Sequence, residues 1–210
     1  MFNQGELSVQ YDFSKHTLQA IWKVRFNEPK KVFRFTLSNL AEVDNIICTP
    51  TAEWKVAREW DPAWQHRSFE YEISCVEPLQ ALELSYHGPV EGWCNIIEEK
   101  RVTLSGYSGW YPGYPSSPIH TFYKLPGMKD YFVINGRYDQ AEDTWVYGEG
   151  GYDEGNIIAL KERQYQVARN GDFSFYYVNE PDKAYADLYA AHYGDIITVL
   201  QFHSNPEKAQ

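Results

Sequence analysis

Hydrophobic and polar residues alternate with a period of two over most of this sequence. Every second residue is apolar or aromatic between residues 7 and 13, and the same alternation runs from 18 to 26. Successive side chains of a strand point to opposite faces of a sheet, so each stretch presents one apolar face. The other segments that predict strands are 32–37, 69–75, 81–86, 93–104, 119–125, 131–134, 144–147, 157–160 and 173–178.

Turn residues separate these segments at short intervals. Asn27-Glu28-Pro29-Lys30 predicts a turn after the second strand. Asn135-Gly136 and Asn170-Gly171 are dipeptides typical of tight turns between strands. About a dozen short strands with regular turn signals predict an all-β fold, either a sandwich or stacked antiparallel sheets.

The segment 50–67 departs from the alternating pattern. It contains three tryptophans, and two of them, Trp60 and Trp64, are one helical turn apart. We therefore predict a loop with a short helix between the strands on either side.

The C-terminal segment predicts an α-helix. Glu180-Pro181-Asp182 is typical of a helix start, with proline in the first turn and acid near the positive end of the helix dipole. Large side chains then recur at helical spacing at Tyr185, Leu188, Tyr189, His192, Ile196, Val199 and Leu200. The chain therefore divides into a β-domain, 1–180, and a C-terminal helix with a frayed tail, 181–210. The stripe needs a partner surface and also allows self-association.

Charge and composition exclude several classes of function. The chain has 19 Lys and Arg against 29 Asp and Glu, a net charge of −10, without a basic cluster that would favour nucleic acid. No apolar run approaches the roughly 20 residues of a membrane helix, and no signal peptide is visible, so we expect a cytoplasmic protein. Cys48, Cys75 and Cys94 are widely spaced, and we expect reduced, partly buried thiols.

The common catalytic motifs do not occur in the sequence. No histidine begins an HExxH pattern, so we assign no metal ligand and no cofactor to this chain. The stretch around Ser108 lacks the final glycine of GxSxG, because Trp110 takes that place. Residues 148–155 are glycine-rich but carry three acids and no base, which predicts a solvated acidic hairpin rather than a phosphate or Ca²⁺ site. We assign no catalytic residue.

Aromatic side chains suggest a binding function. They make up 17% of the chain, and Trp110, Tyr111 and Tyr114 follow a glycine-rich turn. Such rings can stack on a sugar or a peptide, and they can equally close the end of a sheet or fill a core. One hypothesis is therefore a stand-alone carbohydrate- or peptide-binding module. Another is a hydrolase whose Asp and Glu pairs are distant in sequence.

Four short motifs follow one another along the chain. They are Ser85-Tyr86-His87-Gly88, Trp110-Tyr111-Pro112, Lys124-Leu125-Pro126-Gly127 and Asn135-Gly136. This order resembles the N-terminal β-domain of the M1 family of zinc aminopeptidases. The resemblance covers most of the chain: residues 7–26 match the start of that domain, and 173–178 with the following helix resemble the entry into the catalytic domain.

The resemblance implies a non-catalytic role for this chain. The family's HExxH and Gly-x-Met-Glu-Asn segments are missing, so zinc is expected in a catalytic domain that 181–210 would begin. The segment 114–118 contains no Glu or Gln to match the family residue that holds the substrate's amino terminus. The implied function is an N-terminal β-domain that packs on the catalytic domain and walls its cleft.

Overall fold

A computed structural model describes residues 3–60, 67–92, 95–113, 115–148, 155–161, 166–170, 173–177 and 183. The chain forms two compact units, Met1–Ala159 and Leu160–Gln210. Strands make up nearly all the regular secondary structure of the described residues, which confirms the predicted all-β fold. Within these residues, no helix has the length and apolar character needed to cross a membrane.

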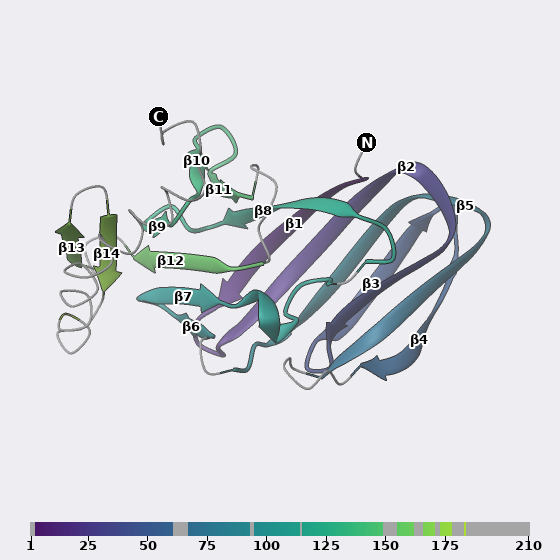
Figure 1. Cartoon of the computed structure of the whole chain (residues 1–210), viewed down its shortest axis with the longest axis horizontal. Helices are drawn as coiled ribbons and strands as arrows, with labels where there is room; N and C mark the ends of the chain where they lie inside the picture. The colour runs from purple at the N-terminus through teal and green to yellow at the C-terminus, as the bar shows by residue number, and fades with distance from the viewer. Residues whose placement is uncertain are drawn as a thin grey trace, which may run out of the picture. The chain divides into compact units, whose positions relative to one another are not determined.

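The larger sheet has eight strands in the order β10-β11-β8-β1-β2-β5-β3, and β4 also pairs with β5 (Figure 1). These strands are β1 (Asn3–Asp12), β2 (Thr17–Ser38), β3 (Glu42–Thr49), β4 (Glu53–Trp60), β5 (Ser68–Pro89), β8 (Ile119–Pro126), β10 (Arg137–Asp139) and β11 (Thr144–Tyr147). Its strand pairs are antiparallel except β1 and β8, which run parallel.

A second sheet has four strands in the order β6-β7-β12-β9. They are β6 (Ile96–Glu98), β7 (Arg101–Leu104), β12 (Ile157–Lys161) and β9 (Tyr131–Val133). The second unit contains a hairpin of β13 (Gln166–Asn170) and β14 (Phe173–Tyr177), in which Asn170 pairs with Phe173. This pairing agrees with the turn predicted at Asn170-Gly171.

One hydrophobic cluster joins the inner faces of the two sheets. From the larger sheet it takes alternate residues of the central strands, such as Leu7, Val9 and Trp22. From the smaller sheet it takes Val102 and Ile157. Because every second residue is buried, the alternation in the sequence reports which face of each strand is covered.

Strands β2 and β5 are longer than the sequence predicts. Each has 22 residues, so β2 runs through the predicted turn 27–30, and β5 joins the two predicted strands 69–75 and 81–86. The predicted turn is wrong. The register between β2 and β5 shifts between Arg25 and Val32, and this irregularity accommodates the polar residues without ending the strand.

The loop predicted for 50–67 is wrong from residue 53 to residue 60, because Glu53–Trp60 forms β4. The short helix expected around Trp60 and Trp64 falls mostly on 61–66, which lie outside the described residues. This strand pairs antiparallel with β5, and Lys55 lies opposite Glu72. Pairing with a distant strand therefore gives 53–60 a regular structure that the local sequence did not indicate. Trp64 and the predicted C-terminal helix, apart from Lys183, lie outside the described residues.

Candidate functional site

An irregular segment occupies the edge of β2 beyond the end of β1. β1 pairs with β2 only as far as Arg25. Further along, the amide of Thr36 donates to the carbonyl of Gly113 at 2.8 Å, and the amide of Gly113 donates back at 2.9 Å. The amide of Ser38 donates to the carbonyl of Gly109 at 2.8 Å. We call residues 109–113 and 115–116 the strap, because they satisfy backbone groups that a neighbouring strand would otherwise pair.

The strap ends in a reciprocal contact with Arg34. The Ser116 amide donates to the Arg34 carbonyl at 2.8 Å, and the Arg34 amide donates to Ser116 Oγ at 2.9 Å. At its other end, Gly109 adopts a φ of 65°, a left-handed conformation that favours glycine. The strap is therefore held by hydrogen bonds at both ends.

Trp110 is a core residue rather than a surface ring. Its side chain is only 2% exposed, and its Nε1 donates to the carbonyl of Gly155 at 2.9 Å. The Tyr86 hydroxyl donates to the carbonyl of Trp110 at 2.9 Å. Burial raises the pKa of Tyr86, with smaller contributions from Tyr123 and Tyr11, so this hydroxyl remains a donor at neutral pH.

The other two predicted binding residues lie differently. Tyr111 is half-buried, and its ring centroid is 5.4 Å from that of Trp110 and 6.3 Å from that of Tyr123. Tyr114 lies outside the described residues. The structure therefore places the strap residues Trp110 and Tyr111 in one aromatic cluster with Tyr123, and a binding role for the three predicted residues stays a prediction.

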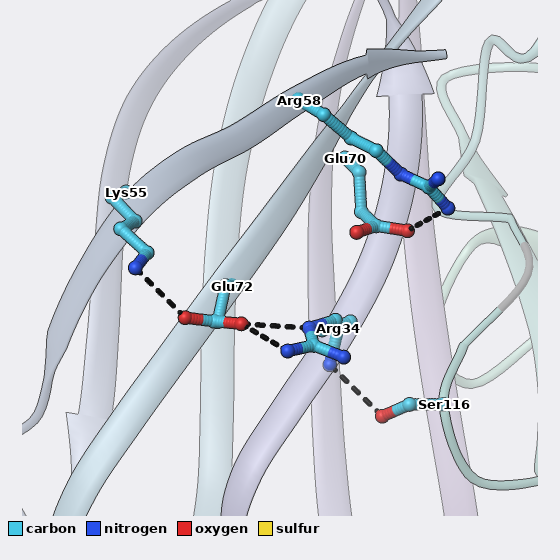
Figure 2. Close-up of polar contacts among 6 residues, drawn as sticks. All are labelled: Arg34, Lys55, Arg58, Glu70, Glu72 and Ser116. Carbon is cyan, nitrogen blue, oxygen red and sulfur yellow. Dashed lines mark hydrogen bonds and ion pairs between the residues drawn. The ribbon is translucent and has the colours of Figure 1, made fainter.

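Charged side chains form a ladder on the outer face of β2, β5 and β4 (Figure 2). Glu72 on β5 lies between Arg34 on β2 and Lys55 on β4, its direct neighbours in the sheet register. Arg34 Nε donates to Glu72 Oε2 at 2.7 Å, a second guanidinium nitrogen contacts the same oxygen, and Lys55 Nζ lies 3.0 Å from Oε1. Both oxygens of Glu72 are thus paired with cations.

A second ion pair extends this ladder along β4. Arg58 Nη2 donates to Glu70 Oε2 at 3.1 Å, and the Arg58 guanidinium carbon lies 4.9 Å from the centroid of the Trp60 ring. Arg58 therefore combines an ion pair with a cation–π contact. We call Arg34, Lys55, Arg58, Glu70 and Glu72 the charged ladder.

The electrostatics of the charged ladder suit a clamp rather than a catalyst. Hydrogen bonds from Arg34 and then Lys55 lower the pKa of Glu72, and Glu72 in turn raises the pKa of Arg34. Glu72 is therefore ionised at neutral pH and cannot supply a proton as a general acid. The arrangement links the edge strand β4 to β5, and β5 to β2, through side-chain ion pairs.

Sequence reasoning did not find the charged ladder. Lys55 and Arg58 are three residues apart, a spacing that a regular strand would place on opposite faces, so the local sequence gave no signal for them. The register that brings both to Glu72 and Glu70 depends on pairing with β5 and on a bulge at Ala57, and neither is visible locally.

The sequence predicts reduced, partly buried cysteines, and the two described ones agree with this. Cys48 and Cys75 are free and half-buried, whereas Cys94 lies outside the described residues. Burial, together with the nearby Cys75, raises the pKa of Cys48 to about 11. The Cys48 thiol is therefore protonated and weakly nucleophilic at neutral pH.

The described residues do not fit a zinc site. In that part of the chain no three His, Cys, Asp or Glu side chains lie together in a way that could hold a metal ion. The Ser108 hydroxyl is buried and donates to the carbonyl of Ser105 at 2.7 Å, within a short 3₁₀ turn, Gly106–Ser108. The acidic segment 149–154 lies outside the described residues.

These features define a β-domain of two stacked sheets with a buried aromatic strap. The sequence matches no protein-family model and no curated protein sequence. Among solved structures, the chain is similar to yeast LTA4 hydrolase in complex with bestatin, with a TM-score of 0.52 and 10% identity over 82% of this chain. Native yeast LTA4 hydrolase gives a TM-score of 0.51 and 11% identity over the same share.

The chain therefore has the fold of the N-terminal β-domain of M1 zinc aminopeptidases, and the resemblance inferred from the sequence is confirmed at the level of fold. The match covers 30% of the yeast LTA4 hydrolase chain, so this chain corresponds to under a third of it. An M1 zinc metallopeptidase from Deinococcus radiodurans also matches, with a TM-score of 0.43 and 15% identity over 84% of this chain and 46% of that one.

Proposed function

We propose that this chain is the non-catalytic N-terminal β-domain of an M1-like zinc metallopeptidase, which packs on the catalytic domain and walls one side of its cleft. The main support for the proposal is the similarity of fold to yeast LTA4 hydrolase. The matched region covers 82% of this chain but only 30% of the yeast chain. A part of this size leaves room in such an enzyme for a separate catalytic region.

The chemistry of the described residues supports a non-catalytic role. The sequence contains no HExxH motif, and the two carboxylates of the charged ladder are paired with cations. Cys48 is protonated at neutral pH because burial raises its pKa. Zinc and the reacting groups would therefore come from the catalytic region.

The four-stranded sheet is the better candidate for the packing surface. Its inner face carries Val102 and Ile157, so by strand alternation Ile158 lies on its outer face, where it is 39% exposed. The outer face of the larger sheet carries ion pairs, such as Lys23 with Glu83, beside its own exposed Ile21. An apolar position favours contact with another domain, whereas a charged face favours solvent.

The first test is to recover the protein from its source cells with an antibody against this chain. We expect a band far above 24.5 kDa, or a tightly bound partner, together with zinc and hydrolysis of aminoacyl-coumarin substrates. The isolated chain should show neither zinc nor turnover. A 24.5 kDa protein recovered without zinc, turnover or a peptidase partner would contradict the proposal.

A matched pair of variants tests the packing surface. Ile158 and Ile21 lie on different sheets and are 39% and 38% exposed. With the catalytic region supplied in trans, Ile158→Lys should weaken association, because it places a charge in an apolar contact, and Ile21→Lys should leave it unchanged. Equal effects, or a larger effect at Ile21, would remove the four-stranded sheet from the proposal.

A further inference from the structure

Strand β4 lies at the margin of the eight-stranded sheet (Figure 1). One of its sides pairs with β5 from Glu53 to Trp60. Among the described residues, no strand pairs with its other side. An edge of this kind presents backbone N–H and C=O groups that another extended chain can pair with.

One face of β4 is apolar and open to solvent in the first half of the strand, before the exposed Glu59. Trp54 and Val56 lie opposite Ile73 and Tyr71, on the core side of the sheet, yet they are 45% and 47% exposed. The ring of Tyr71 stacks on buried Phe35 with centroids 5.2 Å apart, and Trp54 follows at 6.2 Å from Tyr71. A row of aromatic rings therefore runs outward from the core and ends in an accessible tryptophan.

The other face of β4 presents positive charge. The side chains of Lys55 and Arg58 are 68% and 57% exposed, whereas their partners Glu72 and Glu70 are 13% and 17% exposed. The carboxylates lie beneath the cations, and Glu72 is shared with Arg34. On this face Lys55 and Arg58 are exposed cations above two largely covered carboxylates, and Glu53 is an exposed carboxylate at the start of the strand.

We propose that the outer edge of β4 binds an extended peptide segment of another protein by β-strand addition, and that the bound segment alternates acidic and apolar side chains. Its backbone would pair with β4, its acidic side chains would lie beside Lys55 and Arg58, and its apolar side chains would pack beside Trp54 and Val56. Neighbouring strands place alternate side chains on opposite faces, so this alternation matches both faces of β4 at once. The proposal does not rest on the proposed peptidase function.

Two other roles are possible for the same features, and the experiment must separate them. Charged residues and a bulge, such as that at Ala57, also protect an edge strand from pairing. A second copy of this chain could also occupy the edge. The first alternative predicts no peptide binding, and the second predicts a dimer.

The test uses the full chain and three synthetic eight-residue peptides: one alternating Glu and Val, one alternating Lys and Val, and the Glu–Val peptide N-methylated at alternate amides. Calorimetric titration should show saturable binding of the Glu–Val peptide. We expect the Lys–Val and N-methylated peptides to bind at least about tenfold more weakly, because they lose the charge pairing or the backbone hydrogen bonds.

Matched variants place the binding at β4. Val56→Ser should weaken binding of the Glu–Val peptide severalfold, whereas Ile47→Ser, at a position on β3 of similar exposure (52% against 47%), should not. Lys55→Gln should likewise weaken binding, whereas Lys15→Gln, at an exposed lysine in the β1–β2 turn, should not. Circular dichroism would establish that each variant retains its fold.

Three outcomes would overturn the proposal. One is the absence of saturable binding of the Glu–Val peptide by the folded chain. Another is equal affinity for the N-methylated peptide, which would mean that binding does not use the backbone edge. The third is a sedimentation mass of twice the chain mass that Val56→Ser returns to the monomer, which would identify a second copy as the occupant.

Discussion

The two ends of strand β2 are held in different ways. From Thr17 to Arg25 its edge pairs with β1 in an unbroken antiparallel register. From Arg34 to Ser38 the same edge is held by the strap, which provides a few backbone hydrogen bonds and a buried tryptophan instead of a strand. The comparison shows that an irregular segment can replace a strand when its hydrogen bonds and one large side chain are placed correctly.

Removing the buried ring of the strap is expected to have the largest effect. Trp110→Ala should lower the free energy of unfolding by about 3–5 kcal/mol, because it leaves a large cavity and frees the carbonyl of Gly155. Urea unfolding followed by circular dichroism measures this change. Trp54→Ala, at a ring that is 45% exposed, is the matched control and should cost clearly less. Equal losses at the two sites would mean that the strap does not depend on its buried ring.

Gly155, whose carbonyl accepts the hydrogen bond from Trp110, is expected to give the next largest effect. Gly155 has a φ of +68°, and a Cβ there would lie 2.3 Å from Cε1 of Tyr111, so Gly155→Ala should destabilise the fold by about 1–3 kcal/mol. Gly127 has a similar φ of +73° with nothing within 4 Å of the added carbon. Gly127→Ala therefore measures the backbone cost alone, and its loss in thermal unfolding should be smaller. The reverse order would contradict the close packing on Tyr111.

The hydroxyl of Tyr86 ties the strap to β5. Tyr86→Phe removes the donor to the carbonyl of Trp110 and should cost about 1 kcal/mol in the free energy of unfolding, because a buried carbonyl is left unpaired. The same urea titration measures it. A loss as large as that of Trp110→Ala would mean that the hydroxyl, rather than the ring, organises the strap.

The charged ladder is expected to have the smallest effect, and one that depends on pH. The pKa of Glu72 is lowered from its ordinary 4.5 by Arg34 and Lys55. Its contribution to stability is therefore fully present above that ordinary value and is lost as the pH falls through the lowered pKa of the folded state.

Glu72→Gln should thus reduce the urea midpoint slightly at pH 7 and have less effect at pH 2–3, where the wild-type carboxyl also becomes neutral. High salt should reduce the difference at pH 7, because these groups are close to solvent. A difference that stays constant from pH 7 to pH 2 would show that the ion pairs do not contribute.

The sequence predicted the regular end of β2 better than the strap. The alternation through Leu18, Ala20 and Trp22 was sufficient to assign that strand and its buried face, and all three are buried. The strap has no period, so the sequence leaves open whether Trp110 and Tyr111 bind a ligand or fill the core. Whether a ring in an irregular segment is buried depends on which distant residues pack against it, and the local sequence does not show these residues.

The charged ladder illustrates the same limit. Glu70 and Glu72 alternate along a predicted strand, but their partners Lys55 and Arg58 lie in a segment that the sequence predicted as a loop with a short helix. Only the pairing of β4 with β5 brings Lys55 to Glu72 and Arg58 to Glu70. Local propensity for a strand is weak compared with the interactions that neighbouring strands provide.

By itself the sequence determined the all-β class, the inward face of most strands, and a resemblance to M1 aminopeptidase β-domains that the fold supports. These features are readable because burial alternates along each strand and leaves a period of two in the residues themselves. Only the tertiary structure decided that β2 and β5 continue through polar residues, that 53–60 is a strand, and that the strap buries Trp110. Each of these depends on partners distant in the chain, whose hydrogen bonds and packing outweigh local preference.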